Sequence, residues 1–347
     1  KEWQGLDRFE ARSKLLKMLS KEGYLEKEEK YNNSVPHGDR SDVVIEPYLT
    51  EQWYVDAKTL AKPALDSVKS GDMKFIPSNW SKTYFEWLEN IQPWCISRQL
   101  WWGHRIPAWY TKDGNIIVAH NEKEAFAIAE KEFGKDIEIY QDEDVLDTWF
   151  SSALWPFSTL GWPEETVEIE KYYPTNLLVT GFDIIFFWVA RMMMMGIHFM
   201  GKRPFSEVYI HALVRDEKGQ KMSKSKGNIV DPLDLIDKYG ADSLRFTLTA
   251  MAAQGRDVKL SESRVQGYRN FGTKIWNASR FCEMNDINNF NSFDKNSLEY
   301  PLNIWILNEF VEMQSQLEKN LTEYRFNDAA NIIYQFIWGT FCDWYIE

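Results

Sequence analysis

Lysine and serine side chains alternate in one short stretch of the chain, residues 221–226, which reads KMSKSK. Ammonium and hydroxyl groups placed side by side suit a polyphosphate whose charge shifts during a reaction, since charge-assisted hydrogen bonds are the strong ones. Between residues 215 and 226 the basic side chains are Arg215, Lys218, Lys221, Lys224 and Lys226, and the acidic ones are Asp216 and Glu217. A solvated lysine-rich turn is the ordinary alternative, but it leaves the serines and the closing Gly227-Asn228 unexplained. The P-loop pattern GxxxxGK[ST] does not occur in the chain.

Two short apolar runs, with a longer one between them, precede this loop. Residues 177–180 and 208–214 have the length of strands, and residues 184–200 have the length of a helix. Strand, helix and strand in this order predict a βαβ unit of a parallel sheet. Because ligands bind beyond the carboxyl ends of such strands, we expect residues 181–183 and 211–228 to lie at a binding site.

The long apolar run predicts a buried helix. It is interrupted by Arg191 and His198 and is shorter than the ~20 apolar residues of a membrane span. Its four consecutive methionines, residues 192–195, are expected to fill irregular gaps in a core, because thioether side chains adapt to such gaps.

Other elements follow from capping residues and apolar spacing. Asp7 with Glu10 predicts the start of a helix that ends at Gly23, and a helix from Ser81 should bury Phe85, Leu88 and Trp87. Short strands are expected over residues 43–45, 52–55 and 116–119, and helices over residues 124–133, 231–240, 241–252, 263–282, 301–324 and 327–345. The change to an all-helical pattern near residue 260 is the predicted domain boundary.

Composition limits the classes of function. A net charge of −12 argues against non-specific nucleic-acid binding by the whole surface, though it allows a local basic groove. The three cysteines, Cys95, Cys282 and Cys342, form no CxxC pair, so neither a zinc ribbon nor a disulfide framework is predicted. A reduced, cytoplasmic setting is therefore expected.

Several motifs resemble one enzyme family. The sequence KMSKS at residues 221–225 resembles the signature loop of class I aminoacyl-tRNA synthetases. WCISRQ at residues 94–99 resembles the branch of this family that charges valine, isoleucine and leucine. QLWWGHRIP at 99–107, DEDVLDTWFSS at 142–152 and GFDIIFFW at 181–188 are most similar to its valine-charging members. The resemblance runs through nearly the whole chain.

The resemblance assigns the lysine loop to ATP. It implies that Lys221 and Lys224 neutralise the phosphates of ATP and the leaving pyrophosphate, with Lys224 the stronger candidate. Ser223 and Ser225 are the hydroxyl groups of the same ATP-binding loop.

The resemblance also implies which residues contact the nucleoside of ATP. It places Gly181 and Asp183 near the adenosine ribose, where the carboxylate of Asp183 would accept hydrogen bonds from the hydroxyl groups. His211 is implied to lie beside the nucleotide, although the family often has glycine at the following position, where this chain has Ala212.

An apolar pocket for the amino acid is implied on the same segments, by Trp149, Ile184 and Trp188. Ile184 and Trp188 are four residues apart in the predicted helix and so should share a face. Without the resemblance, a place in an ordinary core is an equal alternative for both tryptophans. Such a pocket suits valine, but one methylene group is worth only about 1–3 kcal/mol in discrimination and threonine is nearly isosteric with valine.

The chain also departs from the family pattern. The His-Ile-Gly-His signature is absent, GLDRFEAR at residues 5–12 resembles the end of an editing domain, and no zinc knuckle is seen. The expected fold is a Rossmann-like α/β domain with a parallel sheet, followed by an all-α bundle. The predicted domains are an editing-domain remnant (1–45), the second half of the catalytic domain with an insertion at about 111–140 (46–262), and the start of an anticodon-binding domain (263–347). Both ends look cut, which predicts an internal segment.

The function implied is that of a valine-charging ligase. We expect ATP-dependent activation of valine, with magnesium bound to the ATP, and transfer of the valyl group to the 3′ end of its tRNA by a cytoplasmic monomer. The segment alone is expected to be inactive. Two alternatives stay open: a non-catalytic fragment that binds nucleotide or tRNA, and specificity for isoleucine. A purely structural role would leave the lysine loop unexplained.

Overall fold

The computed structural model describes residues 3–38, 41–46, 48–134, 137–223, 226–255, 257–287 and 298–347. The chain forms two compact units, Lys1–Glu51 and Gln52–Glu347, each described by itself. The domain boundaries expected after residues 45 and 262 stay predictions.

The first unit contains one helix, α1 (Arg8–Lys21), within its described residues. It begins as expected at Asp7, whose carboxylate accepts hydrogen bonds from the backbone N–H groups of Phe9 and Glu10 at 2.9 and 3.4 Å. None of the residues of α1 is fully buried, so its apolar face has no core of its own in this unit.

The two short strands expected over residues 43–45 and 52–55 form only in part. The segment 43–45 makes a single bridge, from Val44 to His37. The segment 52–55 becomes β1 (Tyr54–Val55) in the second unit, where it pairs antiparallel with β3 (Trp94–Cys95).

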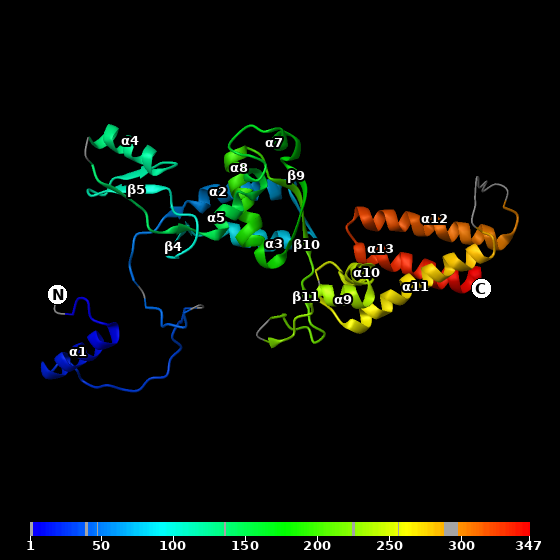
Figure 1. Cartoon of the computed structure of the whole chain (residues 1–347), viewed down its shortest axis with the longest axis horizontal. Helices are drawn as coiled ribbons and strands as arrows, with labels where there is room; N and C mark the ends of the chain where they lie inside the picture. The colour runs from blue at the N-terminus through cyan, green and yellow to red at the C-terminus, as the bar shows by residue number, and fades with distance from the viewer. Residues whose placement is uncertain are drawn as a thin grey trace. The chain divides into compact units, whose positions relative to one another are not determined.

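A parallel sheet of three strands forms the centre of the second unit (Figure 1). Its order is β2 (Lys74–Ile76), β10 (Phe205–His211) and β9 (Thr175–Gly181), and both pairings are parallel. The βαβ unit predicted from the two apolar runs is therefore confirmed.

Three helices pack with this sheet into the main apolar core (Figure 1): α2 (Ala57–Lys69), α3 (Trp80–Glu89) and α8 (Arg191–Met200). Helix α3 begins one residue before the expected Ser81 and buries Tyr84 together with the expected Leu88. Phe85 is only half-buried and Trp87 is 38% exposed, which corrects the prediction for Trp87. Since α2 contacts both α3 and α8, the helices and the sheet together fix the positions of the ends of β9 and β10.

The long apolar run is helical but not one regular α-helix, which corrects the prediction. It starts with a 3₁₀ turn, η1 (Phe182–Ile184), continues as a π-helical segment, η2 (Ile185–Ala190), and becomes α-helical in α8. By length and composition the helix over Phe182–Met200 could cross a membrane, but half of that window is buried inside the fold. The methionines 192–195 are at most 3% exposed, which confirms their role as core filling.

A second cluster of short elements surrounds the motif segments. Its helices are α5 (Thr148–Ala153), α6 (Trp155–Ser158) and α7 (Val167–Tyr172). The strand β4 (Ser97–Arg98) pairs antiparallel with β8 (Val145–Leu146), so two of the motifs seen in the sequence are hydrogen-bonded to each other.

The expected insertion has its own small core. The strands β5 (Ala108–Thr111), β6 (Ile116–Val118) and β7 (Ile139–Gln141) form an antiparallel sheet in the order β6-β5-β7, covered by α4 (Glu122–Phe133). The strand and the helix predicted here are both present.

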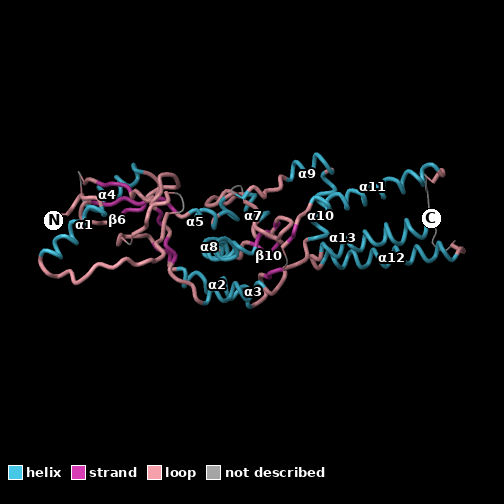
Figure 2. The backbone as a smooth tube through the Cα atoms, turned by 90° about the horizontal axis from the view of Figure 1, so that it is seen from below, coloured by secondary structure: helices cyan, strands magenta, loops and turns pink. Residues whose placement is uncertain are grey.

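The C-terminal part is mostly helical. Helices α9 (Pro232–Tyr239) and α10 (Ala241–Met251) come first, and Asp231 caps α9 as predicted. The parallel pair β11 (Val214–Arg215) and β12 (Val258–Lys259) was not predicted. The bundle follows, with α11 (Glu262–Met284), α12 (Pro301–Thr322), α13 (Phe326–Tyr334) and the π-helical η5 (Gln335–Ile346), and Figure 2 shows α12 and α13 side by side.

Candidate active site

The carboxyl ends of β9 and β10 bring together three residues predicted to bind the nucleoside. Gly181 and His211 are register partners at the last position of the two strands. Asp183 follows in the turn η1 with an exposed side chain, and a Cβ atom on Gly181 would lie 2.6 Å from its Oδ1. A carboxylate and an imidazole at this edge can accept hydrogen bonds from the hydroxyl groups of a sugar.

His211 is held in one tautomer by its neighbour. Its Nδ1 lies 2.9 Å from the backbone carbonyl oxygen of Ala212. Because a carbonyl oxygen only accepts, Nδ1 carries the proton, and Nε2 of the neutral ring is left as an acceptor. The alanine that departs from the family pattern thus supplies this contact through its backbone.

The lysine loop is anchored at its base by the side chain of Asn228, for which the sequence predicted no role. The side-chain oxygen Oδ1 of Asn228 accepts a hydrogen bond from the backbone N–H of Ser223 at 2.9 Å. Its amide donates to Asp216 Oδ2 at 2.9 Å and to the carbonyl oxygen of Lys221 at 3.2 Å. The two ends of the loop are therefore tied together, and Lys221 is presented with an exposed side chain.

Asp216 is the acidic member of this anchor. The amide of Asn228, followed by the backbone N–H of Gln220, lowers the pKa of the Asp216 carboxyl below its usual value. The carboxylate therefore stays charged and bound within the loop at neutral pH. Lys224 and Ser225, the other predicted loop residues, lie outside the described residues.

The three residues predicted to form the amino-acid pocket lie on three elements, α5, η1 and η2. Trp149 on α5 stacks on Phe187 with the ring centroids 5.7 Å apart and the planes at 26°. The indole N–H of Trp188 donates to the carbonyl oxygen of Ser152 at 3.0 Å, so η2 is tied to α5. Trp149, Ile184 and Trp188 are each half-buried, which leaves part of every side chain available to a ligand.

The reason given for pairing Ile184 with Trp188 was wrong. Ile184 ends the 3₁₀ turn η1 and Trp188 lies in the π-helical η2, so the spacing rule of the α-helix does not apply between them. Their joint role in the pocket stays a prediction.

A buried polar cluster behind these residues had no role in the sequence reading. Oδ2 of Asp147 lies 3.0 Å from the indole nitrogen of Trp94, 3.2 Å from Nη1 of Arg191 and 3.3 Å from Nη2 of Arg98. The guanidinium of Arg191 also lies over the Trp94 ring, 3.9 Å from its centroid. A signal was present: Arg191 interrupts the apolar run, and a charge buried there requires a partner.

Arg191 keeps its charge in this setting. Burial lowers the pKa of its guanidinium to about 10, because the charged form loses water, while Asp147 opposes the shift. A group with this pKa is protonated at neutral pH, so the contact with Asp147 is an ion pair.

Metal-binding residues do not gather in the part of the chain that is described. None of its His, Cys, Asp and Glu side chains form a group of three able to hold one ion. Cys95, Cys282 and Cys342 are free thiols. The expectation that zinc is not required stays a prediction.

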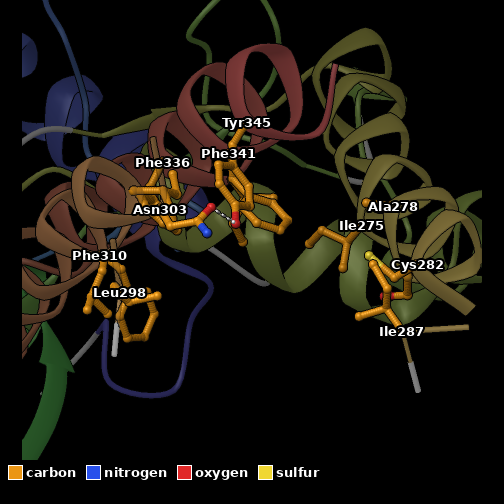
Figure 3. Close-up of a pocket in the computed structure, with 14 residues that line it drawn as sticks. Ile275, Ala278, Cys282, Ile287, Leu298, Asn303, Phe310, Phe336, Phe341 and Tyr345 are labelled. Carbon is orange, nitrogen blue, oxygen red and sulfur yellow. Dashed lines mark hydrogen bonds between the residues drawn. The ribbon is translucent and has the colours of Figure 1, made fainter. Parts of the chain in front are cut away.

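A cavity of ≈ 710 Å³ lies elsewhere, between α11, α12 and η5 of the bundle (Figure 3). Its lining is apolar apart from a few groups such as Asn303, which accepts a hydrogen bond from the hydroxyl of Tyr345 at 3.0 Å. None of the predicted site residues line it, and its apolar character does not suit a phosphate-bearing ligand.

Two family matches divide the chain. Residues 9–261 match the class I tRNA synthetases (I, L, M and V), and residues 303–347 match the anticodon-binding domain of tRNA ligase. The first match contains every predicted site residue.

Curated relatives resemble the chain over its full length. It is 61% identical over 346 residues to the valine–tRNA ligase of Caulobacter vibrioides, and 61% identical over 365 residues to that of Nitrobacter winogradskyi. Each comparison covers 100% of this chain and 38% of the relative. The chain thus spans well under half the length of the relatives it matches.

Solved structures share the fold at low identity. The chain resembles methionyl-tRNA synthetase of Mycobacterium tuberculosis in complex with methionyl-adenylate, with a TM-score of 0.64 and 16% identity over 87% of this chain and 54% of the other. It also resembles a LeuRS–tRNA–LeuAMS complex from Agrobacterium radiobacter, with a TM-score of 0.58 and 20% identity over 71% of this chain and 36% of the other. With the family matches, these likenesses confirm the predicted fold class.

Proposed function

The chain belongs to the class I tRNA synthetases (I, L, M and V), and from this premise we propose that it is a segment of a valine–tRNA ligase. The 61% identity to valine–tRNA ligases over the whole chain supports valine as the amino acid. The observation that carries the proposal is the pairing of Gly181 with His211 at the carboxyl ends of two parallel strands. Asp183 and the lysine loop follow these two ends in the chain.

The proposed reaction has two steps. The carboxylate of valine attacks the α-phosphorus of ATP, the bond to the bridging oxygen breaks, and pyrophosphate leaves as valyl-adenylate forms. A ribose hydroxyl at the 3′ end of the tRNA then attacks the carbonyl carbon, and AMP leaves. Charge develops on the phosphates during the first step, so fixed cations placed there lower the barrier.

Each predicted residue has one role in this scheme. Lys221 and Lys224 neutralise the charge on the phosphates, and Ser223 and Ser225 donate hydrogen bonds to phosphate oxygens. Magnesium, held by the ATP, adds further neutralisation. The exposed side chain of Lys221 and the anchoring of its loop by Asn228 support this assignment.

The nucleoside and amino-acid roles follow from the same arrangement. Asp183 accepts hydrogen bonds from the ribose, and His211 lies beside the nucleotide. Trp149 and Trp188 limit the size of the amino-acid side chain, together with Ile184. The partly exposed rings of these tryptophans support a contact with valine. We also propose that the protein binds tRNA, which the anticodon-binding match supports, and that it is a cytoplasmic monomer.

A second candidate function is favoured by one observation. The sequence of the chain lacks the His-Ile-Gly-His signature that the family resemblance leads one to expect. A fragment that binds nucleotide or tRNA without catalysis is therefore the alternative, and specificity for isoleucine is the neighbouring alternative within the family.

The test is amino-acid-dependent exchange of labelled pyrophosphate into ATP. It is carried out on this chain and on the longest reading frame that contains it, with valine, isoleucine and threonine. We expect exchange with valine by the longest form and none by the chain alone. A preference for isoleucine over valine would make isoleucine the amino-acid substrate. A longest form that folds but shows no exchange with any of the three amino acids would rule out the proposed ligase activity. Exchange by the chain alone would show that the missing signature is not required.

A further inference from the structure

One buried ion pair connects the two segments that carry the pocket tryptophans. Asp147 precedes Trp149 by two residues, and Arg191 follows Trp188 by three. Oδ2 of Asp147 and Nη1 of Arg191 are 3.2 Å apart, and the two side chains are 7% and 9% exposed. The pair therefore links the start of α5 to the start of α8, outside the predicted pocket itself.

A continuous set of contacts leads from this pair to the pocket. The guanidinium carbon of Arg191 lies 5.5 Å from the centroid of the Phe187 ring. Phe187 in turn stacks on Trp149. On the other side, Trp188 is tied to α5 through the carbonyl oxygen of Ser152. A displacement of Arg191 would thus reach Trp149 through packed side chains, and Trp188 through the hydrogen bond that ties its indole to α5.

The position of Asp147 shows that its side chain is used for this connection. Asp147 is the N-cap residue of α5, where aspartate ordinarily accepts a hydrogen bond from the first turn of the helix. Its side chain makes no such capping bond. It instead accepts from Trp94 on β3 and pairs with Arg98 on β4 and with Arg191 on α8.

A buried ion pair is a poor way to gain stability alone, because removing two charges from water offsets their attraction. Its directional contacts, however, fix the elements that carry them. Three donors from three elements converge here on one oxygen atom of Asp147, the residue that precedes α5. This geometry restrains where Trp149 stands relative to Trp188.

We propose that Asp147 and Arg191 are positioning residues that set the separation of Trp149 and Trp188, and with it the size of amino acid that the site accepts. The inference rests on the proposed function, since it names a determinant of that site's specificity. Loss of the ion pair should increase the separation of the two tryptophans or make it less well defined. The residues predicted to bind ATP, at the ends of β9 and β10, should be unaffected.

The test compares Asp147→Asn with Asp72→Asn in the longest form of the protein. The control removes the carboxylate of another ion pair, Asp72–Arg203 at 2.9 Å, which has no contact with the pocket tryptophans. We expect Asp147→Asn to raise the KM for valine and to lower the preference for valine over isoleucine by about tenfold, the scale of discrimination by one methylene group. The KM for ATP should stay within about twofold of its starting value, and the control should change neither quantity.

Three further variants distinguish a loss of positioning from a general folding defect. Arg98→Met removes the half-exposed donor and leaves the buried pair intact, so it should shift the preference in the same direction by a smaller factor. Arg191→Lys keeps the positive charge without the planar fork and should restore part of the preference that Arg191→Met loses. If these variants change thermal stability but leave the valine KM and the preference unchanged, the proposal is overturned.

A readout independent of catalysis separates this inference from the proposed function. In protein labelled with 5-fluorotryptophan, the ¹⁹F resonances of Trp149 and Trp188 are assigned by Trp→Phe variants. Asp147→Asn should shift both resonances, and Asp72→Asn should shift neither. Unmoved resonances would reject the positioning role even in an active enzyme. Shifted resonances in a protein without valine exchange would support positioning while rejecting the ligase.

Discussion

Gly181 and His211 stand directly opposite each other at the last register position of β9 and β10. Parallel pairing places the segments that follow both strands at the same edge of the sheet. The segment after β9 supplies Asp183, and the segment after β10 leads into the lysine loop. The candidate nucleotide site is therefore a product of strand register, and single changes at this edge should affect ATP before valine.

Gly181→Ala should weaken ATP binding in a folded protein. The added Cβ would meet Asp183 Oδ1 at 2.6 Å, a contact that the carboxylate can relieve only by turning away. We expect the KM for ATP to rise by about tenfold, equivalent to about 1.4 kcal/mol, with the KM for valine unchanged. Gly272→Ala is the control, because nothing lies within 4 Å of that position on α11. An unchanged KM for ATP would argue against a ribose contact by Asp183.

Lys224→Ala should slow adenylate formation far more than it weakens valine binding. The cation acts on charge that develops in the transition state, so its loss appears in the rate of activation rather than in substrate affinity. Single-turnover formation of valyl-adenylate measures that rate, and valine binding is measured separately. The control is Lys218→Ala, which also removes one lysine but lies in the turn before the KMSKS sequence. A normal activation rate would remove the loop from the reaction.

Asp216→Asn should slow activation by the same factor at every pH from 6 to 9. The Asn228 amide lowers the pKa of Asp216, so its contribution to the loop is present above the ordinary aspartate range and is lost only as pH falls through the lowered pKa. Asn228→Ala, which removes the partner, should give a similar defect. A factor that changes steeply between pH 6 and 9 would show that another group controls the loop.

The sequence predicted local features better than tertiary ones. The βαβ unit and the cap at Asp231 depend on periodicity and capping chemistry within a few neighbouring residues, and both are present. The strand β12 was missed because two residues give no periodicity and its partner β11 is far away in the chain. The π-helical η2 was missed for a related reason: its aromatic residues fit a regular helix equally well until their partners on α5 are known.

The same limit applies to the candidate site. Motif resemblance picked out the residues at the ends of β9 and β10, which the sheet brings together. It gave no role to Asp147, whose three partners lie on three different elements. The isolated charge of Arg191 in an apolar run was a signal that a partner exists, but the sequence does not say which carboxylate it is.

Trp188→Ala should relax the choice of amino acid. The ring of Trp188 is half-buried and lies beside Trp155, with centroids 5.7 Å apart, so its removal opens space next to α5. We expect exchange with isoleucine to rise relative to valine by about 10-fold or more, since an added methylene group would no longer be excluded. Trp276→Ala, on the exposed side of α11, is the matched control. Retained discrimination would place Trp188 in the core alone.

A contact between the sheet and the bundle offers a test by stability. The hydroxyl of Tyr324, two residues after α12, donates to Glu207 Oε2 on β10 at 2.5 Å. Its ring also packs near Tyr209, with centroids 5.9 Å apart. Tyr324→Phe keeps the ring and removes the hydrogen bond, so we expect a loss of about 1–2 kcal/mol in the free energy of unfolding. Glu207→Gln and the double variant complete a cycle that isolates the pair.

The pH dependence of this loss identifies the hydrogen bond as its cause. The bond to Glu207 raises the pKa of Tyr324, because the carboxylate favours the neutral phenol. A raised pKa stabilises the folded state fully below the unfolded value of about 10 and no longer does so once pH rises through the folded value. The difference in thermal midpoint between the parent and Tyr324→Phe should therefore be constant from pH 7 to 9 and shrink above about pH 10. A difference that persists unchanged to pH 11 would assign the effect to ring packing instead.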